Sequence, residues 1–124
     1  MKIFLAEDNE DNYLIIKSNL RKVQEDVELI WAKDGKEAMM LLDNIEDVSL
    51  FLLDIEMPFI KGNKIAKWIR TKERFNNVPI VAVTASVFAE MKKIYLEEGF
   101  DAILEKPFSR KEFLGIIEEV CHIS

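Results

Sequence analysis

Five short apolar segments alternate with longer segments of helical period along this chain of 124 residues. The apolar segments cover residues 2–7, 27–32, 49–54, 78–84 and 101–105. The central segments are continuously apolar, which is typical of strands buried on both faces of a sheet. A strand–helix unit repeated in this way predicts one parallel sheet with right-handed crossovers and helices on both faces.

Four of the predicted helices carry an apolar stripe with a spacing of three or four residues. The stripes are Ile16, Leu20 and Val23; Ala38, Leu41, Leu42 and Ile45; Gly62, Ile65, Ala66 and Ile69; and Phe113, Ile116, Ile117 and Val120. Two capping boxes, Asp34 with Glu37 and Ser109 with Glu112, are predicted to open helices. Apolar residues of segment 86–98 cover a wide arc, which predicts either a mobile helix or an exposed apolar patch, closed by Gly99 in a left-handed turn.

The predicted fold class is α/β, a flavodoxin-like (βα)5 three-layer sandwich with a parallel sheet in the order 2-1-3-4-5. The chain has the length of one ordinary domain, so residues 1–124 are assigned to a single domain. In this order the first and third strands are neighbours at the point where the strand order reverses. Sheets of this kind bind ligands at that point, beyond the carboxyl ends of the strands.

Charge and composition exclude several classes of function. The formal net charge of −6 opposes binding to nucleic acid or to an anionic membrane. No apolar run approaches the ~20 residues of a membrane span, and the first segment lacks the features of a signal peptide. The single cysteine, Cys121, fits a reducing compartment, so we expect a cytoplasmic protein. Cys121 and His122 lack further ligands nearby, so both are predicted to be ordinary residues of the last helix.

Polar residues follow or end four of the five predicted strands. Glu7 and Asp8 end the first strand, Asp54 the third, Thr84 the fourth and Lys106 the fifth. Because the strands are parallel, these groups are expected at one edge of the sheet. Each has a structural explanation when taken alone; Asp8, or the asparagine after it, is a good N-cap for the first helix. Their coincidence at one edge favours a functional site.

Three carboxylates, a hydroxyl and an ammonium together suit a divalent metal and a phosphoryl group. Two carboxylates ~6 Å apart repel by roughly 3 kcal/mol at an effective dielectric of ~20, and a hard dication relieves that repulsion. Mg²⁺ is the predicted cofactor, with Mn²⁺ able to substitute, because it binds carboxylates and keeps waters that phosphate oxygens replace. Asp54 is then the predicted nucleophile, Lys106 a second cation and Thr84 a hydroxyl donor to the bound phosphoryl group.

The whole chain resembles the receiver domain of two-component response regulators. The motifs that carry the resemblance are Glu7-Asp8-Asn9, Asp54-Ile55-Glu56-Met57-Pro58, Gly62, Val83-Thr84-Ala85 and Lys106-Pro107-Phe108. The string from Glu7 to Asn12 is similar to receivers of hybrid kinases and phosphorelays more than to those fused to DNA-binding domains.

This resemblance implies a role for each residue of the predicted site. Asp54 would accept the phosphoryl group, with Thr84 and Lys106 holding it. The implied metal ligands are Glu7, Asp8, Asp54 and the backbone carbonyl of Glu56. Neighbouring residues implied to tune the site are Glu56, Met57, Ala85 and Pro107, with a cis bond between Lys106 and Pro107. Such domains phosphorylate and dephosphorylate themselves but are not turnover enzymes. We also hypothesise that Glu56 lies beside the path of the hydrolytic water and tunes the lifetime of the phosphorylated state.

Two positions depart from the family pattern. Many receivers have Tyr or Phe three residues before the conserved lysine, as a switch coupled to the threonine, but this chain has Ile103. We therefore expect signalling to run through backbone shifts. The family often has an acidic residue or Asn before Gly62, where this chain has Lys61, and a basic side chain there bears on partner choice.

Two other functions stay open at this point. A phosphohydrolase of the haloacid dehalogenase type also uses a strand-end Asp-x-Asp, although the second position here is Glu56 and the sequence shows no cap domain. A pseudo-receiver would bind proteins without phosphorylation, although every key residue is present. Fold alone does not decide between these functions.

The expected partners are proteins. Because the one histidine stands near the end of the chain, the phosphodonor is expected to be a histidine kinase or a histidine phosphotransfer protein. It would dock beside Asp54, against the first helix and the loop after the fifth strand. A downstream protein target would use Phe88, Tyr95, Lys92, Lys93, Arg110 and Lys111, with core packing of the two aromatics as the alternative. Trp31 and Trp68 are predicted to be packing residues, and the protein a monomer or a weak phosphorylation-dependent dimer.

Overall fold

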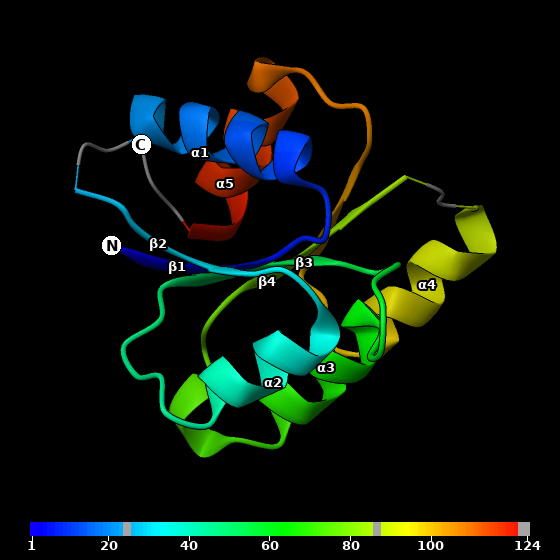
Figure 1. Ribbon diagram of the computed structural model, residues 1–124. Helices are drawn as coiled ribbons and strands as arrows, with labels where there is room; N and C mark the ends of the chain where they lie inside the picture. The colour runs from blue at the N-terminus through cyan, green and yellow to red at the C-terminus, as the bar shows by residue number, and fades with distance from the viewer. Residues whose placement is uncertain (24–25, 86–87, 122–124) are drawn as a thin grey trace.

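The computed structural model describes residues 1–23, 26–85 and 88–121, which form a parallel sheet between two layers of helices (Figure 1). The strands are β1 (Lys2–Ala6), β2 (Glu28–Ala32), β3 (Leu50–Asp54), β4 (Ile80–Thr84) and β5 (Ala102–Glu105). The helices are α1 (Glu10–Val23), α2 (Gly35–Leu42), α3 (Gly62–Arg70), α4 (Ala89–Glu97) and α5 (Arg110–Cys121), with a 3-10 turn η1 (Glu73–Phe75). The strand order β2-β1-β3-β4-β5 confirms the predicted fold class.

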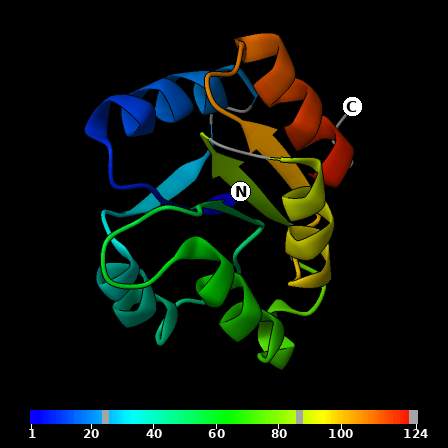
Figure 2. The same cartoon turned by 90° about the vertical axis from the view of Figure 1, so that its right-hand side faces the viewer.

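Two apolar clusters fill the space between the sheet and its helices. Successive side chains of a strand point to opposite faces. In β1, Ile3 and Leu5 therefore join the cluster that contains α1 and α5, whereas Phe4 and Ala6 join the cluster that contains α2, α3 and Tyr95 of α4. Figures 1 and 2 show α1 and α5 on one face of the sheet and α2 and α3 on the other. The three central strands, β1, β3 and β4, are thus buried on both faces, as their continuously apolar sequences predicted.

The predicted capping boxes are correct for α5 and half correct for α2. Ser109 accepts from the N–H of Glu112 at 3.0 Å, and the Glu112 carboxylate accepts from the N–H of Ser109 at 3.1 Å. Asp34 caps α2 by accepting from the N–H of Glu37 at 2.7 Å. The Glu37 carboxylate, however, accepts from the N–H of Lys33 at 3.3 Å, one residue before the predicted partner.

The stripe predicted along α3 is buried throughout, but the stripe on α2 needs a correction. Helix α2 ends at Leu42, so Ile45 is buried in the segment after the helix. Leu41 was predicted to be buried and is instead exposed. A helix turns by about 100° per residue, so Leu41 lies about 60° from Ala38 and about 100° from Leu42, at the margin of the buried face.

Apolar residues of α4 and of the position before it are exposed, in keeping with the wide arc of apolar residues in the sequence. Phe88, Ile94 and Leu96 are exposed, whereas Tyr95 is buried against the sheet. Phe88 is therefore available to a partner, and Tyr95 is a core residue, which corrects its place in the predicted output surface. Gly99 follows the helix with a φ of 115°, in the left-handed turn expected of it.

Three residues of the predictions for segment 86–98 and for the last helix lie outside the described residues. They are Ser86, Val87 and His122. Cys121 ends α5, and burial raises the pKa of its thiol above the usual value.

Within the described part of the chain, no helix combines the length and apolar character needed to cross a membrane.

Arg70, the last residue of α3, makes hydrogen bonds to the segments that precede β4 and β5, at the amino-terminal edge of the sheet. Its guanidinium donates to the carbonyls of Phe75 (3.3 Å), Val78 (2.9 Å) and Gly99 (3.0 Å) and to the carboxylate of Asp101 (2.8 Å). We expect Arg70→Lys to lower the free energy of unfolding by about 2–3 kcal/mol, because an ammonium cannot reproduce this fork of bonds. Urea unfolding at neutral pH measures the loss.

Arg74→Lys is the matched control, because Arg74 makes a single hydrogen bond to backbone, to the carbonyl of Leu42 at 2.8 Å. Its loss should stay below about 1 kcal/mol. Equal losses in the two variants would show that Arg70 is not the stronger connection.

Candidate functional site

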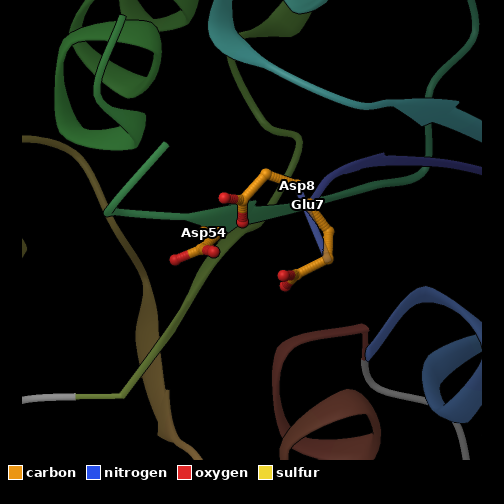
Figure 3. A group of neighbouring side chains, drawn as sticks. All are labelled: Glu7, Asp8 and Asp54. Atoms are coloured by element: carbon orange, nitrogen blue, oxygen red, sulfur yellow. The ribbon is translucent and has the colours of Figure 1, made fainter. Parts of the chain in front are cut away.

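The carboxylates of Glu7, Asp8 and Asp54 converge at the carboxyl edge of β1 and β3 (Figure 3). One oxygen of each lies within 4.8 Å of an oxygen from each of the others. The register explains this, because Ala6 of β1 lies opposite Leu53 of β3, so the residues that follow them are neighbours. The predicted meeting of these acids at one edge is therefore confirmed.

Lys106 brings a cation to the carboxylates from the loop after β5, at the same edge of the sheet. It follows β5, and its Nζ lies 2.9 Å from Glu7 Oε2 and 3.2 Å from Asp54 Oδ2. Its backbone N–H donates to the carbonyl of Thr84, the last residue of β4, at 2.8 Å. Thr84 is buried at the same edge. All of the residues predicted from the strand ends are thus gathered in one place.

Glu7 is completely buried, and its two oxygens have different environments. Oε1 accepts from the N–H of Asn9 (3.3 Å), the side-chain amide of Asn12 (3.3 Å) and Lys106 (3.2 Å). Oε2 accepts no hydrogen bond within the described structure, although Lys106 is close to it. A buried carboxylate oxygen without a hydrogen bond suits a hard cation. With Asp8 and Asp54 it supplies the oxygen ligands that Mg²⁺ prefers, so the residues present fit this ion.

The N-cap of α1 is Asn9 rather than Asp8. The side-chain oxygen of Asn9 accepts from the N–H of Asn12 at 3.0 Å. Asp8 is exposed and takes no part in the cap, so its carboxylate is free to face the acidic cluster. The sequence allowed either residue to be the N-cap of the first helix. In the structure Asn9 is the N-cap, and Asp8 belongs to the acidic cluster.

Burial and charge act in opposite directions on the two central groups. Burial, followed by the charge of Glu7, raises the pKa of Asp54 to about 7, although Lys106 and the N–H of Glu56 partly oppose the shift. Burial opposes the charge of Lys106, but its bonds to Glu7 and its attraction to both acids outweigh this, so its pKa is raised. In the metal-free protein, Lys106 stays charged while Asp54 readily takes up a proton near neutral pH.

The loop between β3 and α3 folds back over Asp54. The N–H of Glu56 donates to Asp54 Oδ1 at 3.1 Å, and the N–H of Gly62 donates to the carbonyl of Ile55 at 2.9 Å. Lys61 Nζ lies 3.6 Å from the carboxylate of Glu56. The unusual lysine of this chain therefore pairs with the residue two positions after Asp54. The metal-binding role of the Glu56 carbonyl stays a prediction.

The roles of the remaining predicted tuning residues stay predictions. Met57 is buried, whereas Ala85 and Pro107 are exposed in the first residues after β4 and β5. The peptide bond between Lys106 and Pro107 is cis, as the resemblance implied. Ile103 is half-buried against the cluster that contains α2 and α3, as a packing residue.

Two contacts of Glu7 were not found from the sequence. The first is the bond from Asn12 described above. The second comes from Trp31, which packs as predicted but also donates its indole N–H to the carbonyl of Glu7 at 2.8 Å. Nothing in the residue pattern signalled this bond, since Trp31 is 24 positions away on another strand.

The family model of the response regulator receiver domain matches residues 3–118. The chain belongs to this family. Receiver domains are phosphoacceptors of two-component signalling and are not turnover enzymes. The family therefore accounts for the convergence of acids, lysine and threonine at the carboxyl edge of the sheet.

Similar receiver domains occur both within long proteins and nearly alone. The chain is 34% identical to the hybrid signal transduction histidine kinase I of Dictyostelium discoideum, over 97% of this chain and 7% of that protein. It is 28% identical to the polar-differentiation response regulator DivK of Brucella ovis, over 94% of this chain and 92% of that protein. The first four curated relatives are longer, and the receiver covers between 7% and 48% of their length.

Among solved structures, the receiver domain of a sensor histidine kinase from Pseudomonas aeruginosa superimposes with a TM-score of 0.83. The two are 28% identical over 98% of this chain and 97% of that one. That receiver domain was crystallised with a magnesium ion coordinated in its active-site cleft.

Proposed function

We propose that this receiver domain, residues 1–124, accepts a phosphoryl group on Asp54 from the phosphohistidine of a histidine kinase or a histidine phosphotransfer protein. The observation that carries the proposal is the position of Asp54. Its carboxylate ends β3 beside two further acids, and Lys106 lies within 3.2 Å of it. A carboxylate in these surroundings is equipped as a nucleophile for phosphoryl transfer.

In the transfer, an oxygen of Asp54 forms a bond to phosphorus while the bond from phosphorus to the histidine nitrogen breaks. The imidazole leaves with the electron pair of that bond and takes a proton from solvent. Lys106 stays protonated and faces the oxygens of the incoming group. The N–H of Glu56 holds Asp54 Oδ1 at 3.1 Å and so fixes the orientation of the carboxylate. The product is an acyl phosphate.

The proposed metal ligands are the carboxylates of Glu7, Asp8 and Asp54 together with the carbonyl of Glu56. Mg²⁺ at these residues would keep Asp54 ionised and neutralise charge on the phosphoryl oxygens. The magnesium ion in the receiver from Pseudomonas aeruginosa supports this assignment. Glu7 contributes a buried oxygen that accepts no hydrogen bond and whose one close cation in the described structure is Lys106, at 2.9 Å.

Thr84 and Lys106 are the proposed origin of switching. Both belong to loops or strand ends next to Asp54, and each gains a bond to the phosphoryl group once it is attached. A contact present in only one state shifts the balance between conformations. Since Ile103 replaces the usual aromatic, the change is proposed to pass through the backbone after β4 and β5 to the exposed residues of α4, where Phe88 is available to a downstream protein.

The phosphodonor is proposed to dock on α1. Leu14 and Ile15 are 50% and 49% exposed on this helix, which starts directly after the acidic pair. Exposed aliphatic residues beside a reactive group suit a partner that must bring its own residue to that group. The net charge of −6 agrees with a protein partner rather than nucleic acid.

Incubation with acetyl phosphate and Mg²⁺, followed by intact mass measurement, tests the proposal. The wild type is expected to gain one phosphoryl group, and Asp54→Asn none. No gain in the wild type, or an equal gain in both, would contradict it. Beryllofluoride with Mg²⁺ tests the pseudo-receiver alternative, which would gain support if the wild type failed to bind it. Family membership gives no support to the haloacid dehalogenase alternative.

We expect Glu56→Ala to slow the decay of the acyl phosphate several-fold, because a carboxylate two positions after Asp54 can orient water and accept its proton. Phosphorylated protein, freed of acetyl phosphate, is followed by intact mass over time. Lys61→Ala is the matched variant, because it removes the charge 3.6 Å from Glu56 and should have the opposite effect. Unchanged decay in both variants would remove Glu56 from the hydrolytic step.

A further inference from the structure

Strand β2 holds the backbone of Glu7 from two directions. The N–H of Glu7 donates to the carbonyl of Ala32 at 3.0 Å, continuing the ladder between β1 and β2. The carbonyl of Glu7 lies beyond the last ladder pair, Ala6 with Ala32. It accepts instead from the indole N–H of Trp31 at 2.8 Å. The side chain of Trp31 therefore supplies a hydrogen bond to a carbonyl that the strand pairing no longer reaches.

The carbonyl that Trp31 holds belongs to the peptide that joins Glu7 to Asp8. A peptide unit is planar, so fixing its carbonyl also fixes the direction in which the chain enters Asp8. Asp8 is exposed, and its carboxylate has no hydrogen bond among those of the described structure. Its position beside Glu7 and Asp54 is thus set mainly by its backbone. The peptide before Asp8 is held by Trp31 at 2.8 Å, and the peptide after it by the longer bond of 3.3 Å from the N–H of Asn9 to Glu7.

The indole of Trp31 is itself held in place by α1. Its ring stacks on Tyr13, with ring centroids 3.8 Å apart and planes inclined by 5°. The ammonium groups of Lys33 and Lys17 lie 5.2 Å and 5.7 Å from the ring centroids of Trp31 and Tyr13, respectively. A partly buried ring with a stacked partner and a cation above it has little freedom to turn. Trp31 therefore offers its N–H to Glu7 in one fixed direction.

We infer that Trp31 is a positioning residue for the metal site: its indole N–H aligns the peptide between Glu7 and Asp8 so that both carboxylates face the ion. The inference rests on the proposed function, because it requires that these acids bind Mg²⁺. Ligands held in the correct orientation before binding lose less freedom when the ion arrives. The removal of the N–H should thus weaken Mg²⁺ binding while the fold persists.

Trp31→Phe tests the inference, because phenylalanine keeps a ring to stack on Tyr13 but has no donor. Calorimetric titration with MgCl₂ is expected to show binding about fivefold weaker than in the wild type, the size of one hydrogen bond of about 1 kcal/mol. Trp68→Phe and Tyr13→Phe are controls, since Trp68 lies on α3 and the Tyr13 ring is kept. Both should bind Mg²⁺ like the wild type. Wild-type affinity in Trp31→Phe would overturn the inference.

A wild-type protein that binds no Mg²⁺ would instead contradict the proposed function, so the two failures are distinguishable. If Trp31→Phe does not fold, nitrogen-15 NMR of the indole groups provides a second test. Trp68→Phe identifies the Trp31 signal by leaving it as the one indole resonance, since the chain has two tryptophans. Mg²⁺ is expected to shift the Trp31 signal and leave that of Trp68 in place. A Trp31 signal that does not move at saturating Mg²⁺ would also overturn the inference.

Discussion

In metal-free buffer at pH 8, Asp54→Asn is expected to be more stable than the wild type by about 2–4 kcal/mol. Asp54 is 4% exposed, and burial, then the charge of Glu7, raises its pKa to about 7 from 3.8. The folded wild type thus favours the protonated acid. The contribution of this carboxyl group to stability is fully present below about pH 4 and is lost as the pH rises from there through 7, because ionisation is easier in the unfolded chain. Asparagine carries no such charge.

Urea unfolding with a chelator, at a series of pH values from 4 to 8, measures this difference. The gap between Asp54→Asn and the wild type should close towards pH 4, where the acid is protonated in both states. Asp26→Asn is the control, because Asp26 is exposed at the opposite end of β2 and should behave like the wild type. Addition of Mg²⁺ should stabilise the wild type and leave Asp54→Asn nearly unchanged. A variant less stable than the wild type at pH 8 would contradict the burial argument.

Gly62→Ala is expected to lower the free energy of unfolding by about 3 kcal/mol or more. Gly62 begins α3, which packs directly on the last residue of β3. A methyl group there would overlap the carbonyl oxygen of Asp54 and lie 2.8 Å from its carbonyl carbon and 3.1 Å from the Cα of Ile55. These are backbone atoms of a buried strand, so they cannot turn aside as a flexible side chain would. Either α3 moves or the loop around Asp54 is displaced.

Gly115→Ala is the matched control for this substitution. Gly115 is exposed on α5, and an added methyl group would meet no atom within 4 Å. The change should raise stability by about 0.5–1 kcal/mol, because alanine favours the helix. Urea unfolding of both variants should therefore give shifts of opposite sign. Wild-type stability in Gly62→Ala would show that α3 is not in close contact with Asp54.

The sequence was sufficient to predict the sheet and the residues at its carboxyl edge. A parallel strand that is buried on both faces has a simple sequence pattern, which is an apolar run followed by a polar residue. Asp54 and Thr84 end such runs. Because strand order and register then place the ends of β1 and β3 side by side, Glu7 and Asp54 could be predicted as neighbours without knowledge of any contact. The reasoning needed only the period of a strand and the direction of the chain.

The features that the sequence did not predict depend on the paths of individual side chains. Trp31 reaches a carbonyl that its neighbours in the sequence do not specify, and Lys61 pairs with Glu56 across a loop. Leu41 fits the period of a buried stripe, yet it lies at the margin of the buried face of α2 and is exposed. Helix length, loop conformation and the reach of a side chain are set by tertiary packing, which overrides local pattern.

The bond from Lys106 to Glu7 spans 99 positions of the chain, and this separation bears on biosynthesis. A nascent polypeptide that is still being synthesised, with its first strands outside the ribosome and paired, would present Glu7 and Asp8 but not the cation of Lys106. Contacts between distant positions form late, because a large loop must close first. The site would therefore be able to accept a phosphoryl group only after the last strand has joined the sheet. Incomplete chains would not take part in signalling.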